Sequence, residues 1–280
     1  MEKLLYHYVD SDLRLRHAVD EVPDKNDFTM HVHEHYEIYL FISGHAKYIV
    51  EGSVYPLEPG TVIIIRPTEI HKAEIIGEQQ YERYSVNFST DFLENIDPEH
   101  RLMKAFDSHP HGLENMYHAS DFVNNRVYDT FKQMCSAGSE DDYDKRLRIY
   151  TGLFSLLEEI NTAYINRNTQ ERIKPPSQSE QIVRYVNKHL FEELSVPIIA
   201  EKFHMSTSQL SRIFKKGAGC SIWEYISAKR LSMARIKIHN GMNAQTAGEE
   251  CGFKDYSSFY RSYVKRYGVS PKYDDFLPRE

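Results

Sequence analysis

Residues 251–259 read Cys-Gly-Phe-Lys-Asp-Tyr-Ser-Ser-Phe, and residues 268–271 read Gly-Val-Ser-Pro. This stretch predicts the second half of a helix-turn-helix. Gly252 can supply the turn, Asp255 can cap the helix that follows, and Phe259 falls on the inner face of that helix. Upstream, Asn243 can cap a short first helix that has small apolar residues on its inner side. The pattern therefore predicts a compact pair of helices near the end of the chain.

The same pattern occurs about 48 residues earlier. Ser195 can cap a helix whose first turn holds Pro197, and His204 falls at a turn position, where histidine tolerates a positive φ better than most residues. Ser206 begins a second helix and is predicted to form a capping box with Gln209. The buried stripe of that helix is then Leu210, Ile213 and Phe214.

One long amphipathic helix, residues 222–239, is predicted to join the two units. At about 1.5 Å per residue it spans roughly 26 Å. A rod of this length can hold two recognition helices close to one DNA turn apart, about 34 Å. Its predicted apolar stripe is Trp223, Ile226, Leu231, Ala234 and Ile238.

Two further segments carry a family pattern: Leu-Ser-Arg-Ile-Phe-Lys-Lys-Gly-Ala-Gly at 210–219 and Arg-Leu-Ser-Met-Ala at 230–234. Together with the segments above, they resemble the AraC/XylS family of bacterial transcription regulators over roughly residues 180–275. The resemblance implies a two-domain α+β protein. An N-terminal cupin-like β-barrel would bind an effector, and a helical dimerisation segment would follow it. The C-terminal all-α domain would carry two helix-turn-helix motifs joined by a long helix. Each monomer would insert two recognition helices into successive major grooves.

Two features depart from the family pattern. Ala244, Ala247, Gly248 and Cys251 are smaller than the aliphatic residues usual in the core of the second unit, and Asp274 falls where an aromatic residue is usual. We therefore expect the second unit to be the softer of the two.

The outward faces of the two recognition helices are the predicted DNA surface. An arginine can bond guanine bidentately, a serine can bond more than one base, and an aromatic ring can pack on a thymine methyl. For Arg212 and Arg261, contact with phosphate and bracing of the fold are alternatives to base contact. Motif position implies these DNA-binding residues: Ser208, Ser211, Arg212 and Lys215 in the first unit, and Tyr256, Ser257, Tyr260 and Arg261 in the second.

The charge distribution favours nucleic acid as the partner of the C-terminal part alone. The whole chain has a net charge of −7. Residues 180–280 carry 16 lysines and arginines against 11 acidic residues, whereas residues 1–179 carry 18 against 30. Eleven of the fourteen histidines precede residue 120. Two domains with different partners are therefore expected.

The N-terminal part predicts β-strands. Short runs rich in β-branched and aromatic residues occur at residues 37–42, 47–50, 61–65 and 81–88. Their regular spacing favours a barrel or a sandwich. The order His31, His33, Glu37, Gly44, followed by a glycine-initiated strand, Pro67 and His71, resembles the two cupin motifs.

Four polar side chains are predicted to converge in this barrel. In a strand, His31 and His33 point to the same face and Glu37 keeps that parity, while His71 would come from a paired strand. Three imidazoles and one carboxylate could hold Fe, Mn, Ni or Zn. A small effector, commonly a sugar in this family, and a hydrogen-bonded core without ligand are the alternatives. We assign all four as effector-binding residues, and assign no metal ligand, catalytic residue or cofactor.

The other polar side chains of the barrel are less informative. His35 and His45 lack partners at ligand spacing and are predicted to lie on the surface. The tyrosines could stack on a sugar or simply pack. They are Tyr36, Tyr39, Tyr48 and Tyr55.

Helical spacing returns after the barrel. The apolar stripe of residues 147–164 could pack on its own barrel or on a second copy, and the resemblance favours the second copy, hence a homodimer. Its members are Leu147, Tyr150, Phe154, Leu157 and Ile160. The predicted domains are a cupin-like effector-binding domain (1–98), a helical dimerisation segment (99–168), a linker (169–179) and the DNA-binding domain (180–280).

Composition narrows the function further. No run of 18 apolar residues predicts a membrane span, the N-terminus lacks a secretory signal, and three widely spaced cysteines fit the cytoplasm better than a disulfide scaffold. We predict a non-enzymatic, cytoplasmic regulator that binds double-stranded promoter DNA, responds to a small effector and recruits RNA polymerase as an activator, with repression as the alternative. The rival hypothesis is a cupin metalloenzyme, an isomerase or dioxygenase, fused to a DNA-binding domain. A constitutive DNA binder is a lesser rival.

Overall fold

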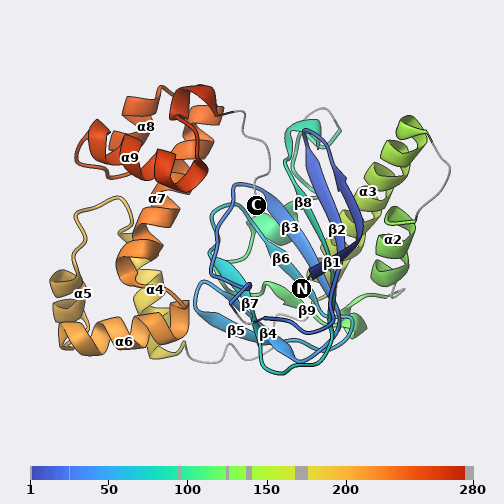
Figure 1. Ribbon diagram of the computed structural model, residues 1–280, viewed down its shortest axis with the longest axis horizontal. Coiled ribbons are helices and arrows are strands. Elements are labelled where there is room, and N and C mark those ends of the chain that lie inside the picture. The colour runs from blue at the N-terminus through green and yellow to red at the C-terminus, as the bar shows by residue number, and fades with distance from the viewer. Residues whose placement is uncertain are drawn as a thin grey trace.

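The computed structural model describes residues 2–24, 26–93, 96–123, 126–136, 141–167 and 176–274. A β-rich N-terminal part is followed by a helical C-terminal part (Figure 1). In that view the helices after residue 176 lie on one side of the sheets, and those of residues 127–166 lie on the other. Much of the predicted linker, residues 168–175, lies outside the described residues. In the described ranges, no helix is long and apolar enough to cross a membrane.

Two antiparallel sheets form the barrel. The larger has the order β1 (Glu2–Val9), β2 (Leu13–Asp20), β8 (Tyr81–Phe88), β3 (Tyr36–Ser43), β6 (Val62–Ile65) and β9 (Met116–Tyr117). The smaller has the order β5 (Ser53–Pro56), β4 (Ala46–Val50) and β7 (His71–Ile75). Side chains of β3 alternate between two cores: Ile38 and Leu40 face the helices, whereas Tyr39 and Phe41 face the small sheet. The four predicted strands are confirmed.

The N-terminal hairpin of β1 and β2 was not predicted. Charged residues and histidines interrupt its apolar residues, so no apolar run longer than three residues marks it. Leu13 and Leu15 are fully buried in the core, while Arg14 and Arg16 between and beside them face the other way and line a cavity. The alternation is therefore present in β2, but the charged residues of the hairpin obscure it.

The predicted dimer stripe needs a correction. Leu157 and Ile160 are fully buried against the larger sheet, and Tyr150 and Phe154 are partly buried in the same cluster. Most of the stripe therefore covers its own barrel and does not form a seam for a second copy, while Leu147 stays exposed. The helices of this part are α1 (Lys104–Asp107), α2 (Val127–Met134) and α3 (Asp142–Asn166).

The helical part contains both predicted helix-turn-helix units. Its helices are α4 (Gln178–Lys188), α5 (Val196–Lys202), α6 (Thr207–Ala218), α7 (Ile222–His239), α8 (Ala244–Glu250) and α9 (Tyr256–Tyr267). Ser195, Ser206, Asn243 and Asp255 each cap a helix through a side-chain hydrogen bond, as predicted. Both turns have a positive φ, 54° at His204 and 83° at Gly252. The sequence therefore located these helix boundaries correctly.

The small residues of the second unit have a packing reason. A Cβ added at Gly248 would lie 2.8 Å from a ring carbon of Phe259, so the glycine lets the aromatic ring approach α8. Asp274, the other departure from the family pattern, accepts hydrogen bonds from Arg235 at 2.7 and 2.9 Å and from Tyr263 at 2.7 Å. Gly248 and Asp274 are thus each matched by a specific neighbour in the C-terminal part.

The inner face of α7 differs from the predicted stripe. Trp223 is 52% exposed, whereas Lys229 and Arg235 are buried. The helix is covered from more than one direction, because the two helix-turn-helix units and the barrel all pack against it. A single amphipathic stripe therefore could not describe it.

Candidate effector cavity and nucleic-acid interface

A cavity of about 710 Å³ lies between the barrel and the helical part. Its barrel side includes residues that the sequence singled out: His31, His33, Glu37, Tyr39 and Tyr48. Its other wall includes Arg235 of α7 and Arg266 and Tyr267 of α9. A molecule in this cavity would therefore contact both parts of the chain.

The backbone brings the four predicted polar residues together. His31 and His71 form an isolated antiparallel bridge, in which each N–H donates to the carbonyl oxygen of the other at 3.0 and 2.9 Å. The ring of His71 lies 4.2 Å from that of His31 and 4.8 Å from that of His33, between centroids. Glu37 Oε2 lies 2.9 Å from His33 Nε2 and 3.5 Å from His71 Nε2. His33 itself lies outside a strand, since β3 begins only at Tyr36.

The carboxylate of this cluster is ionised. Burial alone raises the pKa of Glu37, but the hydrogen bond with His33 and the nearby ring of His71 outweigh burial and hold the pKa well below its usual range. Asn87 of β8 adds a neutral donor, because its Nδ2 donates to Glu37 Oε2 at 3.0 Å. The cluster therefore places a negative charge beside three imidazoles.

The remaining predictions for the barrel divide. His45 is exposed as predicted. His35 is instead buried at the edge of the same cavity, and burial lowers its pKa to about 3. Tyr36 and Tyr55 do not line the cavity: Tyr36 donates to Asp107 at 3.1 Å, and Tyr55 to the Gly112 carbonyl oxygen at 2.7 Å. Of the four predicted tyrosines, Tyr39 and Tyr48 therefore line the cavity.

Two buried ion pairs join the barrel to α7, and the sequence did not predict them. Lys229 Nζ lies 2.7 Å from Glu51 Oε1, and Arg235 Nη1 lies 2.7 Å from Glu34 Oε2. All four side chains are 3% exposed or less. The signal that could have found them is the presence of charges on inner positions of α7, since buried charges are almost always paired.

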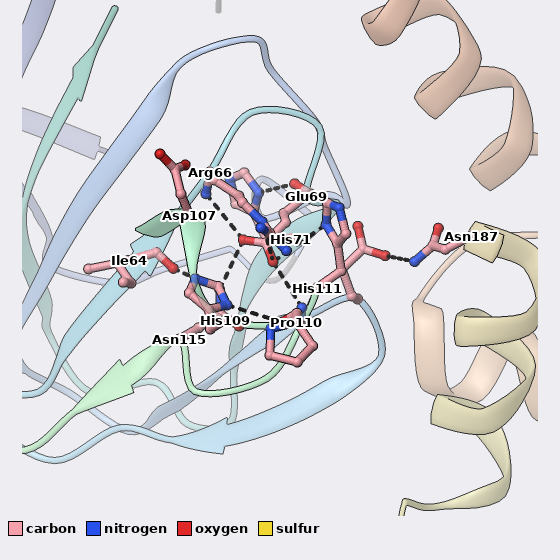
Figure 2. Close-up of polar contacts among 12 residues, drawn as sticks. Ile64, Arg66, Glu69, His71, Asp107, His109, Pro110, His111, Asn115 and Asn187 are labelled. Carbon is pink, nitrogen blue, oxygen red and sulfur yellow. Dashed lines mark hydrogen bonds and ion pairs between the residues drawn. The ribbon is translucent and has the colours of Figure 1, made fainter. Parts of the chain in front are cut away.

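Glu51 collects hydrogen bonds from both parts of the chain. Figure 2 shows Asn187 of α4 pointing at the barrel, where its Nδ2 donates to Glu51 Oε2 at 2.7 Å. The Tyr225 hydroxyl of α7 donates to the same carboxylate, and the backbone N–H of Ile70 donates at 2.8 Å. Burial raises the pKa of Glu51, but the charge of Lys229, the nearby ring of His111 and the hydrogen bonds from Lys229 and Tyr225 together outweigh burial and leave the pKa lowered.

A second buried carboxylate, Glu69, lies next to this contact and holds a loop of the barrel (Figure 2). It accepts from the backbone N–H of Gly112 and from Asn115 Nδ2, both at 2.9 Å, and burial raises its pKa. The loop of residues 107–115 is fastened in this way, so we assign Glu69 to the fold rather than to a ligand.

The eight predicted DNA-binding side chains are all exposed on α6 and α9. Ser211 Oγ donates to the Thr207 carbonyl oxygen at 2.8 Å, so its hydroxyl already has one partner within the helix. Lys215 also borders a second cavity of about 410 Å³ beside Met30 of the barrel. The outward faces of both recognition helices are therefore accessible, and the C-terminal end of α6 lies closest to the barrel.

Comparisons with known protein families agree with this architecture. An AraC-like ligand binding domain matches residues 20–157, and a helix-turn-helix domain matches residues 199–273. The chain belongs to the AraC family of transcription regulators. As a member of the AraC family it is a DNA-binding transcription regulator with a ligand-binding domain, and this family is not one of enzymes. The metalloenzyme hypothesis is therefore not retained.

Relatives of the AraC-family chain include activators. It is 22% identical over 250 residues to the HTH-type transcriptional activator RhaS of Mannheimia succiniciproducens, covering 88% of each chain. It is 21% identical over 271 residues to RhaS of Escherichia coli O139:H28, covering 91% of this chain and 95% of the relative. Among solved structures, ToxT from Vibrio cholerae aligns over 100% of this chain and 99% of its own at 14% identity and a TM-score of 0.37. The DNA-binding domain of AdpA in complex with a target DNA aligns over 35% and 88% at 19% identity and a TM-score of 0.33.

Proposed function

We propose that this protein is a cytoplasmic transcriptional activator that binds promoter DNA as a homodimer, recruits RNA polymerase and responds to a small effector of the carbohydrate class. The observation that carries the proposal is the shared lining of the cavity, where Arg235 and Arg266 lie across from the histidines. A ligand shifts a conformational equilibrium only through contacts that differ between the two states. An effector in this cavity contacts the DNA-reading part directly and needs no relay.

The carbohydrate class is supported by the chemistry of the cavity. Its volume of about 710 Å³ is ample for a small molecule. His33, Glu37 and Asn87 offer hydrogen-bonding groups, and Tyr39 and Tyr48 offer ring faces on which the apolar face of a sugar packs. The effector residues proposed here are His31, His33, Glu37 and His71.

The homodimer needs a surface other than the buried stripe. Tyr143 and Leu147 at the start of α3 are 73% and 54% exposed, and Tyr128 of α2 is 42% exposed. Apolar side chains of this kind are covered in many dimers. Replacing Tyr143 and Leu147 by serine should convert a dimer to a monomer in sedimentation velocity. A parent chain that is monomeric at micromolar concentration overturns the dimer.

The effector response is tested with the full chain and a duplex that it binds. Fluorescence anisotropy measures DNA affinity with and without each pentose and hexose of a panel. One sugar should change the affinity by about 5- to 150-fold, the usual size of an allosteric coupling. His33→Ala should lose that ratio, while His45→Gln, which replaces an exposed histidine, should keep it. If no sugar changes either the affinity or the thermal midpoint, the carbohydrate class is wrong.

A further inference from the structure

The three histidines of the polar cluster, His31, His33 and His71, share one hydrogen-bond pattern. Each Nδ1 lies near a backbone carbonyl oxygen: His31 on Thr29 at 3.0 Å, His33 on His35 at 3.0 Å and His71 on Glu69 at 2.7 Å. A carbonyl oxygen can only accept, so each Nδ1 carries a proton and donates it. In the neutral ring, Nε2 then presents a lone pair. The backbone therefore selects the same tautomer three times.

These lone pairs meet in one place. Within the described residues, one ring nitrogen from each of the three histidines lies within 4.8 Å of the others. Glu37 Oε2 lies 2.9 Å from His33 Nε2, a contact that needs either a proton on Nε2 or a cation bound by both atoms. Asn87 Nδ2 donates to that carboxylate and lies 3.2 Å from the same nitrogen. Nε2 of His71 is buried and makes no hydrogen bond. A group of acceptors facing one another is unfavourable unless a cation lies among them.

We propose that His31, His33, His71 and Glu37 form a binding site for one divalent transition metal ion of the Zn²⁺, Fe²⁺ or Ni²⁺ type. Neutral imidazoles and a carboxylate are the ligands that these ions prefer. The carbonyl partners orient the rings as outer hydrogen bonds do around metal-bound histidines. Ligand atoms about 2.1 Å from a metal are about 3 to 4 Å apart, so small side-chain rotations close the cluster. His31 is the exposed ligand, and the ion would face the cavity.

The segment of residues 31–34, which supplies two of the proposed ligands, also forms hydrogen bonds with the DNA-binding part. Val32 and Glu34 alternate with His31 and His33. The Val32 carbonyl oxygen accepts from Arg266 Nη2 at 3.0 Å. Glu34 accepts from Arg235 Nη1 at 2.7 Å and from the Tyr267 hydroxyl at 2.8 Å. Binding of His31 and His33 to an ion would therefore also fix Val32 and Glu34, the residues that accept hydrogen bonds from α7 and α9. A metal-dependent change in DNA affinity follows, and this second step rests on the proposed function.

Metal binding is measured first, on the full chain freed of metal with EDTA and dialysed. Calorimetry with Zn²⁺ should give one ion per chain, and Co²⁺ should give visible absorption bands of bound metal. His31→Asn and His71→Ala should each weaken binding at least tenfold, while His45→Gln should bind as the parent does. His31 is exposed, so His31→Asn tests the site even if His71→Ala fails to fold. Absence of stoichiometric binding, or binding unchanged in His31→Asn, overturns the site and leaves a protonated His33 paired with Glu37.

The effect of metal binding on DNA binding is measured next, by comparing the DNA affinity in Zn²⁺ with that in EDTA. The expected ratio is about 5- to 150-fold. Arg266→Gln removes the bond to Val32 and should reduce the ratio, whereas Lys265→Gln, an exposed neighbour on α9, should not. Metal binding without any change in DNA affinity overturns the second step alone. If the chain binds no specific DNA under either condition, the proposed function fails while the metal titration still decides the site.

Discussion

Lys229 of α7 and Glu51 of the β4–β5 turn form an ion pair with a 2.7 Å separation, and both side chains are buried between the barrel and the helices. Glu51 has a φ of 49°, which is uncommon for a residue other than glycine, and this turn holds its carboxylate against α7. The second pair, Arg235 with Glu34, lies further along the same helix. Because α7 connects the two helix-turn-helix units, these pairs tie the position of both recognition helices to the barrel.

Breaking this pair should destabilise the protein strongly. Lys229→Met leaves the carboxylate of Glu51 buried without its cation, which costs about 3–5 kcal/mol of unfolding free energy. Adding Glu51→Gln should recover part of the loss, because the uncompensated charge is then removed. Urea unfolding of the two single variants and the double variant measures both effects.

The matched control is Lys237→Met, also on α7, which removes the partly exposed pair with Glu250 of α8. Exposed pairs contribute about 0–1 kcal/mol. If Lys229→Met costs no more than Lys237→Met, the contact between barrel and helices does not persist in solution.

A methyl group on Gly248 should disturb the second helix-turn-helix unit. The added Cβ would lie 2.8 Å from the ring of Phe259, which is fully buried, so the ring has to move. Overpacking of this kind costs about 1–3 kcal/mol. Thermal unfolding of Gly248→Ala measures the loss, with Gly77→Ala, where the nearest atoms are 3.8 Å away, as the control. Equal stability of the two variants would contradict the close packing of α8 on α9.

The fold was largely predictable from the sequence where local signals are strong. The caps at Ser206 and Asp255 and the turns at His204 and Gly252 depend on short-range hydrogen bonds and backbone conformation, and the structure contains all of them. The first hairpin and the exposure of Trp223 were missed, because both depend on what packs, or does not pack, against them. The same is true of the apolar stripe of α3, for which the sequence cannot distinguish its own sheet from a second copy.

Acidic conditions should weaken the fold through His109. This side chain is 3% exposed, and burial lowers its pKa from 6.5 to about 4. Between these values the unfolded chain binds more protons than the folded chain, so stability is complete above pH 6.5 and falls as the pH falls. The expected contribution at pH 5 is a loss of about 2 kcal/mol.

The pH dependence is tested by urea unfolding at pH 7 and pH 5. In His109→Gln the difference between the two pH values should be about 2 kcal/mol smaller than in the parent. His45→Gln, at an exposed position, should keep the parent's difference. An unchanged difference in His109→Gln would mean that His109 does not cause the dependence.

Arg212 distinguishes base reading from backbone contact. If its guanidinium bonds a guanine, Arg212→Ala should cost about 1–3 kcal/mol on the bound sequence and relax the preference at one position. A phosphate contact would instead lower affinity on all sequences and reduce the salt slope by about 0.9. A bracing role would lower the thermal midpoint and leave the base preference intact. Lys202→Ala on α5, outside the recognition helix, serves as the control.

The candidate site was predictable in its members but not in its setting. The spacing of His31, His33, Glu37 and His71 indicated one cluster, and the structure brings these side chains together, although His33 lies outside the strand on which the predicted parity depended. The opposite wall did not follow, because Arg235 and Arg266 come from the other end of the chain. Neither residue carries a local signal that it faces the barrel. The partners are far apart in the sequence: Arg235 and Glu34, for example, are 201 residues apart.

The central claim is that both recognition helices, α6 and α9, bind DNA. It is tested most directly by selecting duplexes from a random pool with the purified full chain. The structure leads us to expect an enriched site with two short blocks about 10 base pairs apart, the spacing of successive major grooves. If these arginines bond bases, Arg212→Ala should relax the preference at one position of one block and Arg261→Ala at one position of the other, each leaving the second block intact. An enriched site with a single block that is insensitive to Arg261→Ala, or no enriched site at all, would contradict the account.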